Sequence, residues 1–246
     1  GTTQFLNKKL REDVPIFSKQ QVKHTLNHPL VQMAASNGTI VLALGNKTLQ
    51  RLDQSSANGI ETIDLSKVLT NNKIAQLFLD PFGNHLVATL KPTDPDGLPD
   101  LLYLSRKSVK PKMSSKIKGH FVSAIGWNLN NETDASTGSI LVGTSRGLIF
   151  ETELTSGDDR LFSSGLEMYW KQIFDIGKGQ HIPINGLEFY QVPQTKKYFI
   201  IAVTPTRMYQ FQGYASGDNE SRPLLQHIFN NYLNIPERFL ELPSSL

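Results

Sequence analysis

The feature that most constrains this chain is an internal repeat in which two short apolar strands flank a tight turn. Three segments align on this template: Val41–Leu52, Ile140–Glu151 and Ile201–Phe211. In a fourth copy, a Pro- and Asp-rich insertion replaces the tight turn between His85–Leu90 and Asp100–Ser105. Short apolar runs bounded by turn residues are typical of all-β proteins. A unit that recurs along a chain indicates an architecture built from stacked repeats.

Each copy of the template has further strands on both sides. A predicted strand lies just upstream of every copy, and a weaker outer strand follows it, so each unit contains about four strands. Asn37-Gly38 is typical of a primed hairpin turn, in which both residues need positive φ. Asp80-Pro81-Phe82-Gly83 is typical of a type I turn. The upstream strands are Leu30–Ala35, Ile74–Leu79, Phe121–Trp127 and Ile184–Phe189, and the outer strands are Ile60–Leu65, Val109–Ile117, Trp170–Ile176 and Phe239–Leu242.

The repeat therefore predicts an all-β protein with the architecture of a β-propeller. Four-stranded units of about 40–50 residues are the blades of such folds. A blade cannot bury both of its faces alone, and neighbouring blades stacked around an axis cover them. A β-sandwich would account for the strands but not for their fourfold recurrence. We place the four blades at residues 30–72, 73–120, 121–183 and 184–246.

Two segments lie outside the repeat. Residues 1–29 form an N-terminal extension in which Val14–Phe17 could be an edge strand, where a proline is tolerated. Our hypothesis is that this strand completes the last blade of a longer chain. Between Leu224 and Tyr232, apolar residues recur at helical spacing, which predicts one short helix with a packing face. We expect the four blades to be the N-terminal part of a larger ring.

Composition and motifs exclude several kinds of chemistry. The 246 residues include no cysteine, which rules out disulfides, thiol catalysis and Cys-ligated metals. The nucleophile-elbow, Walker and H-E-x-x-H patterns are absent. His24 and His28 have helical metal-ligand spacing, but Pro29 disfavours a helix there. Acidic residues are sparse on the predicted inner strands, which disfavours a propeller hydrolase. We expect no catalytic residue, metal or cofactor, and therefore not an enzyme.

Nothing in the sequence resembles a membrane span. The longest apolar run, Phe199–Val203, is far shorter than the roughly 20 residues that a membrane helix requires. Residues 1–20 contain no apolar segment typical of a secretory signal. We therefore expect a cytoplasmic protein.

Five ordered sequence blocks resemble a known family. Together they are similar to the N-terminal propeller of the vacuolar sorting protein eighteen (deep orange) family, whose members are subunits of the HOPS and CORVET tethering complexes. The resemblance runs from about residue 12 to the end of the chain, and its specificity lies in the order and spacing of the blocks. The blocks are Val14–Gln20, Leu77–Leu86, Lys118–Asn128, Thr137–Glu151 and Pro205–Phe211.

The resemblance implies a non-enzymatic interaction scaffold that acts in vesicle docking and membrane fusion. Its expected partners are other tethering subunits and endolysosomal trafficking proteins. Its expected location is the cytoplasmic surface of late endosomes, lysosomes or vacuoles, as a peripheral protein. The residues themselves indicate only a propeller without a recognisable catalytic motif.

A local basic band is the candidate contact surface. The net charge of the chain is only +3, but no acidic residue lies between Asp100 and Glu132. The band could bind an acidic protein partner or, in the alternative function, anionic lipid headgroups of a membrane. We do not expect nucleic acid as a partner, because no aromatic residues interleave with the charges. The band could equally be a solvated edge strand that its lysines protect from aggregation. Its residues are Arg106, Lys107, Lys110, Lys112, Lys116 and Lys118.

Overall fold

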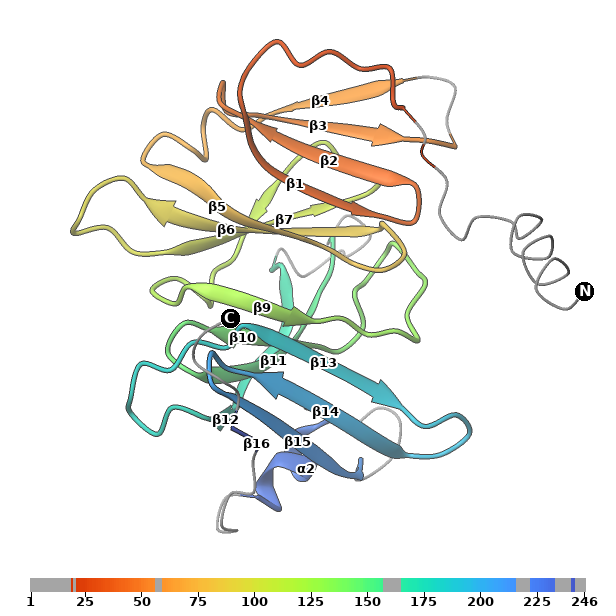
Figure 1. Cartoon of the computed structure of the whole chain (residues 1–246), viewed down its shortest axis with the longest axis vertical. Helices are drawn as coiled ribbons and strands as arrows, with labels where there is room; N and C mark the ends of the chain where they lie inside the picture. Colours follow the sequence, from red (N-terminus) through yellow and green to blue (C-terminus); the bar gives the residue numbers. More distant parts are fainter. Residues whose placement is uncertain are drawn as a thin grey trace, which may run out of the picture.

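The computed structural model consists of four four-stranded antiparallel sheets stacked one after another (Figure 1). It describes residues 19, 21–55, 59–156, 165–215, 222–232 and 240–241. Each sheet is a meander in which consecutive strands pair, as in propeller blades, so the predicted fold class is confirmed. The predicted edge strand Val14–Phe17 lies outside the described residues.

We number the sheets as blades 1 to 4 along the chain. Blade 1 contains β1 (Leu30–Ser36), β2 (Thr39–Leu44), β3 (Thr48–Asp53) and β4 (Ile60–Asp64). Blade 2 contains β5 (Asn72–Leu79), β6 (His85–Pro92), β7 (Asp100–Ser105) and β8 (Lys112–Met113). Blade 3 contains β9 (Val122–Gly126), β10 (Ile140–Thr144), β11 (Leu148–Leu154) and β12 (Glu167–Asp175). Blade 4 contains β13 (Gly186–Gln191), β14 (Lys197–Val203), β15 (Arg207–Tyr214) and β16 (Leu240–Glu241).

Both predicted turns are present. Asn37 and Gly38 both have positive φ, at 46° and 73°, between β1 and β2. In the Asp80–Gly83 turn, the buried Asp80 carboxylate accepts hydrogen bonds from the backbone N–H groups of Phe82, Asn84 and His85. Asp80 therefore stabilises a turn, as its Pro and Gly neighbours predicted.

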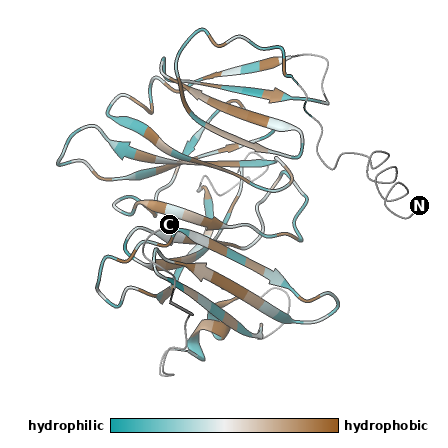
Figure 2. Cartoon of the chain, viewed as in Figure 1, coloured by the Kyte–Doolittle hydropathy of each residue, from teal (hydrophilic) through white to brown (hydrophobic). Residues whose placement is uncertain are grey.

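The core lies between the blades, and the middle strands explain why. Leu86, Ala88 and Leu90 of β6 pack against blade 1, whereas Val87 packs against blade 3. A strand covered on both faces must be apolar at successive positions, which is why β6 and β10 are near-continuous apolar runs. In β14, by contrast, buried positions that face blade 3 alternate with partly exposed ones. Figure 2 shows hydrophobic stretches along the strands of all four sheets.

The outer strand of blade 2 is the element for which the sequence prediction is wrong. Instead of a strand over Val109–Ile117, only β8, Lys112–Met113, pairs with β7. Pro111 has no N–H to donate to a ladder. The Ser114 hydroxyl accepts hydrogen bonds from the N–H groups of Lys116 and Ile117, so the chain turns there. Because the strand is broken, β8 contributes only one lysine, Lys112, to the sheet.

The predicted short helix is present as α2 (Gln226–Asn230), and its apolar face packs as expected. Ile228 and Phe229 are fully buried in the core between blades 3 and 4. The segment leading into α2 is held by Glu151 of β11, a buried carboxylate that accepts hydrogen bonds from the N–H groups of Leu224 at 2.6 Å and Leu225 at 2.7 Å. Burial raises the pKa of Glu151 above its ordinary value, and these donors act in the opposite direction.

No helix among the described residues is long and apolar enough to cross a membrane.

Candidate partner-binding surface at the junction of blades 1 and 2

The structure divides the basic band between the two ends of β7. Arg106 and Lys107 directly follow the C-terminal end of this strand, and Lys110 lies in the loop that leads to β8. Lys116 and Lys118 lie near its N-terminal end, because Ser114 N–H bonds to the Leu101 carbonyl and Gly119 N–H to the Pro99 carbonyl. Five residue steps of extended chain, about 17 Å, separate the two ends of β7. Arg106, Lys107 and Lys110 therefore lie apart from Lys116 and Lys118. The half-buried Lys112 of β8, opposite Tyr103, lies between the two groups.

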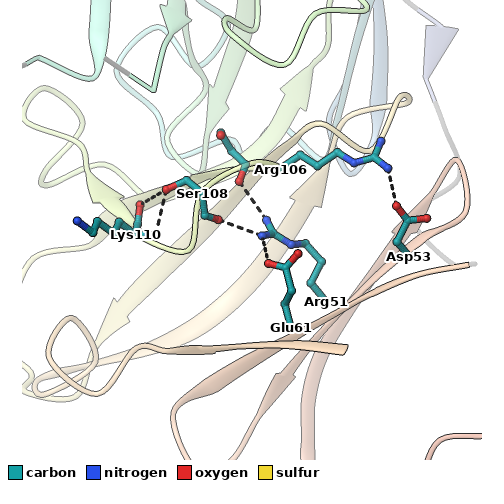
Figure 3. Close-up of polar contacts among 7 residues, drawn as sticks. Arg51, Asp53, Glu61, Arg106, Ser108 and Lys110 are labelled. Carbon is teal, nitrogen blue, oxygen red and sulfur yellow. Dashed lines mark hydrogen bonds and ion pairs between the residues drawn. The ribbon is translucent and has the colours of Figure 1, made fainter. Parts of the chain in front are cut away.

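Arg51 of β3 is the residue that organises the end near Arg106. Its side chain is only 8% exposed and points from blade 1 to the chain that follows β7 in blade 2 (Figure 3). The guanidinium donates to the carbonyls of Ser105 and Ser108, both at 3.0 Å, and to the Glu61 carboxylate at 2.6 Å. Glu61 is 55% exposed, so this carboxylate remains largely hydrated. Arg51 of blade 1 thus binds backbone carbonyls of blade 2 and forms an ion pair with the partly exposed Glu61.

Two adjacent cations of blade 2 reach in opposite directions. Arg106 donates to Asp53 of blade 1 at 2.5 Å, as Figure 3 shows. Lys107 forms an ion pair at 3.0 Å with Asp134, in the β9–β10 connection of blade 3. The pKa of Asp53 lies below its ordinary value, mainly because Ser55 donates to the carboxylate and secondarily because of Arg106. These residues connect three blades on one edge of the molecule.

A pocket of about 380 Å³ opens at this junction. Its walls come from β2, β3 and β4 of blade 1 and from the end of β7 in blade 2. Cationic and anionic side chains both contribute, so the pocket has mixed charge rather than a single sign. The lining residues are Thr39, Arg51, Asp53, Gly59, Glu61, Arg106 and Lys107.

The charges of the band differ in how they are matched. Arg106 and Lys107 have carboxylate partners. The pKa of Asp100 lies above its ordinary value because the carboxyl is partly buried. The Leu101 N–H and the positive charge of Lys118 partly offset this rise. Over the described part of the chain, Lys110 and Lys116 take part in no ion pair, and both are exposed. Lys112 is half-buried on β8.

Sequence analysis did not identify Arg51, Asp53 or Glu61 as part of this surface. A signal was available in the strand period, because Arg51 follows Leu49 at a spacing of two and so lies on the same face of β3. Leu49 is buried in the core between blades 1 and 2. A charged residue at such a position requires partners from the neighbouring blade.

The histidines considered as metal ligands are not brought together in a metal site. His24 Nε2 lies 2.8 Å from the amide oxygen of Gln50 on β3. Within the ranges that the structure describes, no three His, Cys, Asp or Glu side chains are placed to hold a metal ion.

The fold and this junction define a β-propeller with a charged surface where blades meet. A family model described as the Pep3/Vps18/deep orange beta-propeller domain matches residues 15–246. The chain belongs to this family, and the resemblance seen in the sequence is confirmed.

Curated relatives agree with this assignment. The chain is 33% identical over 243 residues to "Vacuolar protein sorting-associated protein 18 homolog" of Danio rerio, covering 98% of this chain and 24% of that protein. It is 33% identical over 241 residues to the Drosophila melanogaster homolog, covering 91% of this chain and 23% of that protein. It is 31% identical over 216 residues to "Vacuolar sorting protein 18" of Arabidopsis thaliana, covering 87% and 20% respectively. The chain thus spans at most about a quarter of the length of these relatives.

Solved structures of low sequence identity also resemble the chain. One is a chain in the crystal structure of a mitotic checkpoint complex, with 13% identity and a TM-score of 0.47, covering 95% of this chain and 59% of that one. Another is the Cps50 (Swd1) beta-propeller domain of Myceliophteria thermophila, with 12% identity and a TM-score of 0.43, covering 78% of this chain and 54% of that one.

Proposed function

We propose that this propeller is a non-enzymatic interaction scaffold within a subunit of a HOPS- or CORVET-type tethering complex. The observation that carries the proposal is the family match over residues 15–246, together with relatives named for vacuolar protein sorting. Rigid blades are well suited to present loops and edges to partners. The expected partners are the other tethering subunits and endolysosomal trafficking proteins. The expected location is the cytoplasmic surface of late endosomes, lysosomes or vacuoles.

Two buried titratable side chains, His85 and Glu151, support a scaffold because each joins separate parts of the fold. His85 lies between the Tyr103 hydroxyl, at 2.7 Å from Nδ1, and the Thr133 carbonyl, at 2.8 Å from Nε2. Since a carbonyl only accepts, Nε2 donates to Thr133, while Nδ1 shares a hydrogen bond with the Tyr103 hydroxyl. His85 thus connects blade 2 to blade 3, just as Glu151 connects blade 3 to α2. These groups contribute to rigidity and are turned away from solvent.

The basic band is the contact surface that we propose for a partner. Binding to anionic lipid headgroups is the alternative function, and exposed Lys110 and Lys116 would favour it. The carboxylates of Asp53 and Asp134 beside Arg106 and Lys107 favour a protein, because they would repel an anionic bilayer.

The test is affinity purification of the full-length protein from cells, followed by mass spectrometry. We expect tethering subunits and endolysosomal trafficking proteins to be recovered with it. In parallel, flotation with vesicles containing about 30% phosphatidylserine measures lipid binding, which fades with salt if it is electrostatic. Recovery of no trafficking protein would overturn the scaffold proposal. Strong, salt-sensitive vesicle binding without protein partners would favour the membrane alternative.

A further inference from the structure

The β7–β8 loop of blade 2, residues 106–111, has the properties of a rigid protein-docking loop. We propose that its tip inserts into an apolar socket edged by carboxylates on a protein partner. This inference rests on the proposed scaffold function and specifies the chemistry of the partner at the basic band.

The loop backbone is fixed before any partner binds. Arg51 donates to the carbonyls of Ser105 and Ser108, which flank the first turn of the loop. Arg106 N–H bonds to the Asn84 carbonyl at 2.9 Å, and the Ser108 hydroxyl accepts from Lys110 N–H at 3.0 Å. A loop already held in one conformation loses little entropy on binding, so more of the contact free energy becomes affinity.

The tip carries an apolar side chain between two lysines. Val109 is 56% exposed although it lies in a tethered loop. Lys107 and Lys110 flank it in sequence and are exposed. Figure 3 shows the Lys110 ammonium directed away from the Arg51 cluster. An apolar centre with a charged rim is the usual anatomy of a protein interface.

The charges around the tip determine the class of partner. Asp53 and Asp134 leave this end of the band with mixed charge, and the loop offers one aliphatic side chain without an aromatic residue to anchor in lipid. A protein partner can place carboxylates opposite Lys110 and on the exposed side of Lys107, whose ammonium is paired with Asp134. A fluid anionic bilayer cannot place its charges at chosen positions around the loop.

The same blade contains a matched control. Leu98, in the β6–β7 connection, is 54% exposed, so its apolar side chain is as accessible as that of Val109. Its neighbours Asp94 and Asp96 are acidic, however, so the electrostatic surroundings are the opposite. A partner with carboxylates around its socket should select Val109 and reject Leu98.

The experiment places a photo-crosslinking amino acid at position 109 or 98 of the full-length protein in cells. We expect position 109 to crosslink to one protein, within a peptide that combines Asp or Glu with apolar residues. Lys107→Glu with Lys110→Glu should lower the yield about tenfold, because each reversal places a like charge opposite the carboxylates of the partner. Position 98 should give no such product. Thermal unfolding of each variant verifies that these exposed substitutions leave the fold intact.

Three outcomes would overturn the inference: no crosslink at 109, equal crosslinks at 109 and 98, or crosslinks to lipid alone. The last would instead support the membrane alternative. Recovery of tethering subunits in the same sample reports separately on the proposed function. If the subunits are recovered without a crosslink at 109, the docking loop is refuted and the scaffold stands. If no subunit is recovered, the scaffold itself fails.

Discussion

Replacing Arg51 by alanine should destabilise the propeller more than any other change at its charged junction. The substitution removes the hydrogen bonds to the Ser105 and Ser108 carbonyls. Each bond from a charged donor contributes about 1.5–3 kcal/mol. Part of this gain is offset by the cost of removing the guanidinium from water. We therefore expect a loss of about 3 kcal/mol in unfolding free energy, or about 6–12 °C in Tm for a domain of this size.

Glu61→Gln is the matched control, because it removes the carboxylate partner of Arg51 and leaves the two backbone contacts. Glu61 is 55% exposed, so its ion pair should contribute less than about 1 kcal/mol. Differential scanning calorimetry of both variants gives the comparison, and hydrogen exchange should rise over residues 105–112 in Arg51→Ala alone. Equal, small losses in the two variants would refute the claim that Arg51 joins the blades.

Three further predictions concern the core. Glu151→Gln should become more stable relative to the native protein as pH rises from about 4 to 7, measured by thermal unfolding. Burial raises the pKa of Glu151 in the folded protein. The stability that Glu151 contributes is therefore present below the ordinary pKa of a glutamate and is lost as pH rises through the raised pKa, whereas glutamine does not titrate. Phe229→Ala should cost about 3–5 kcal/mol in denaturant unfolding, because the ring is fully buried between blades 3 and 4. Burial, and to a smaller extent the nearby charge of Arg146, lowers the pKa of His120 in the folded protein. The native protein therefore loses stability as pH falls below about 6.5, and His120→Phe should reduce that loss.

The fold was largely predictable because the strand period and the turn residues are local signals. The fourfold recurrence of apolar runs such as β6 and β10, separated by turns such as Asn37-Gly38, identified the blades. The outer strand of blade 2 was not predicted correctly, because Pro111 and the Ser114 hydroxyl limit it to two residues. A hydroxyl that competes with the ladder has no period that a sequence pattern can reveal.

The candidate surface was predictable only in part, because its acidic partners come from other blades. The band Arg106–Lys118 was visible as a run of cations without intervening acids. The pairing of Arg106 and Lys107 depends on Asp53 and Asp134, which lie far away in sequence and meet the band only in the folded structure. Contacts of this kind require the packing of three blades to be known.

The most direct measurement of the scaffold account is quantitative affinity purification of the full-length protein with charge reversals at either end of the band. Lys107→Glu with Lys110→Glu should remove specific trafficking proteins from the recovered set. Lys116→Glu with Lys118→Glu, at the far end of β7, should leave that set unchanged. If both folded variants recover every partner at the native level, partner recruitment does not depend on this surface and the basic band is refuted as the contact site of the scaffold.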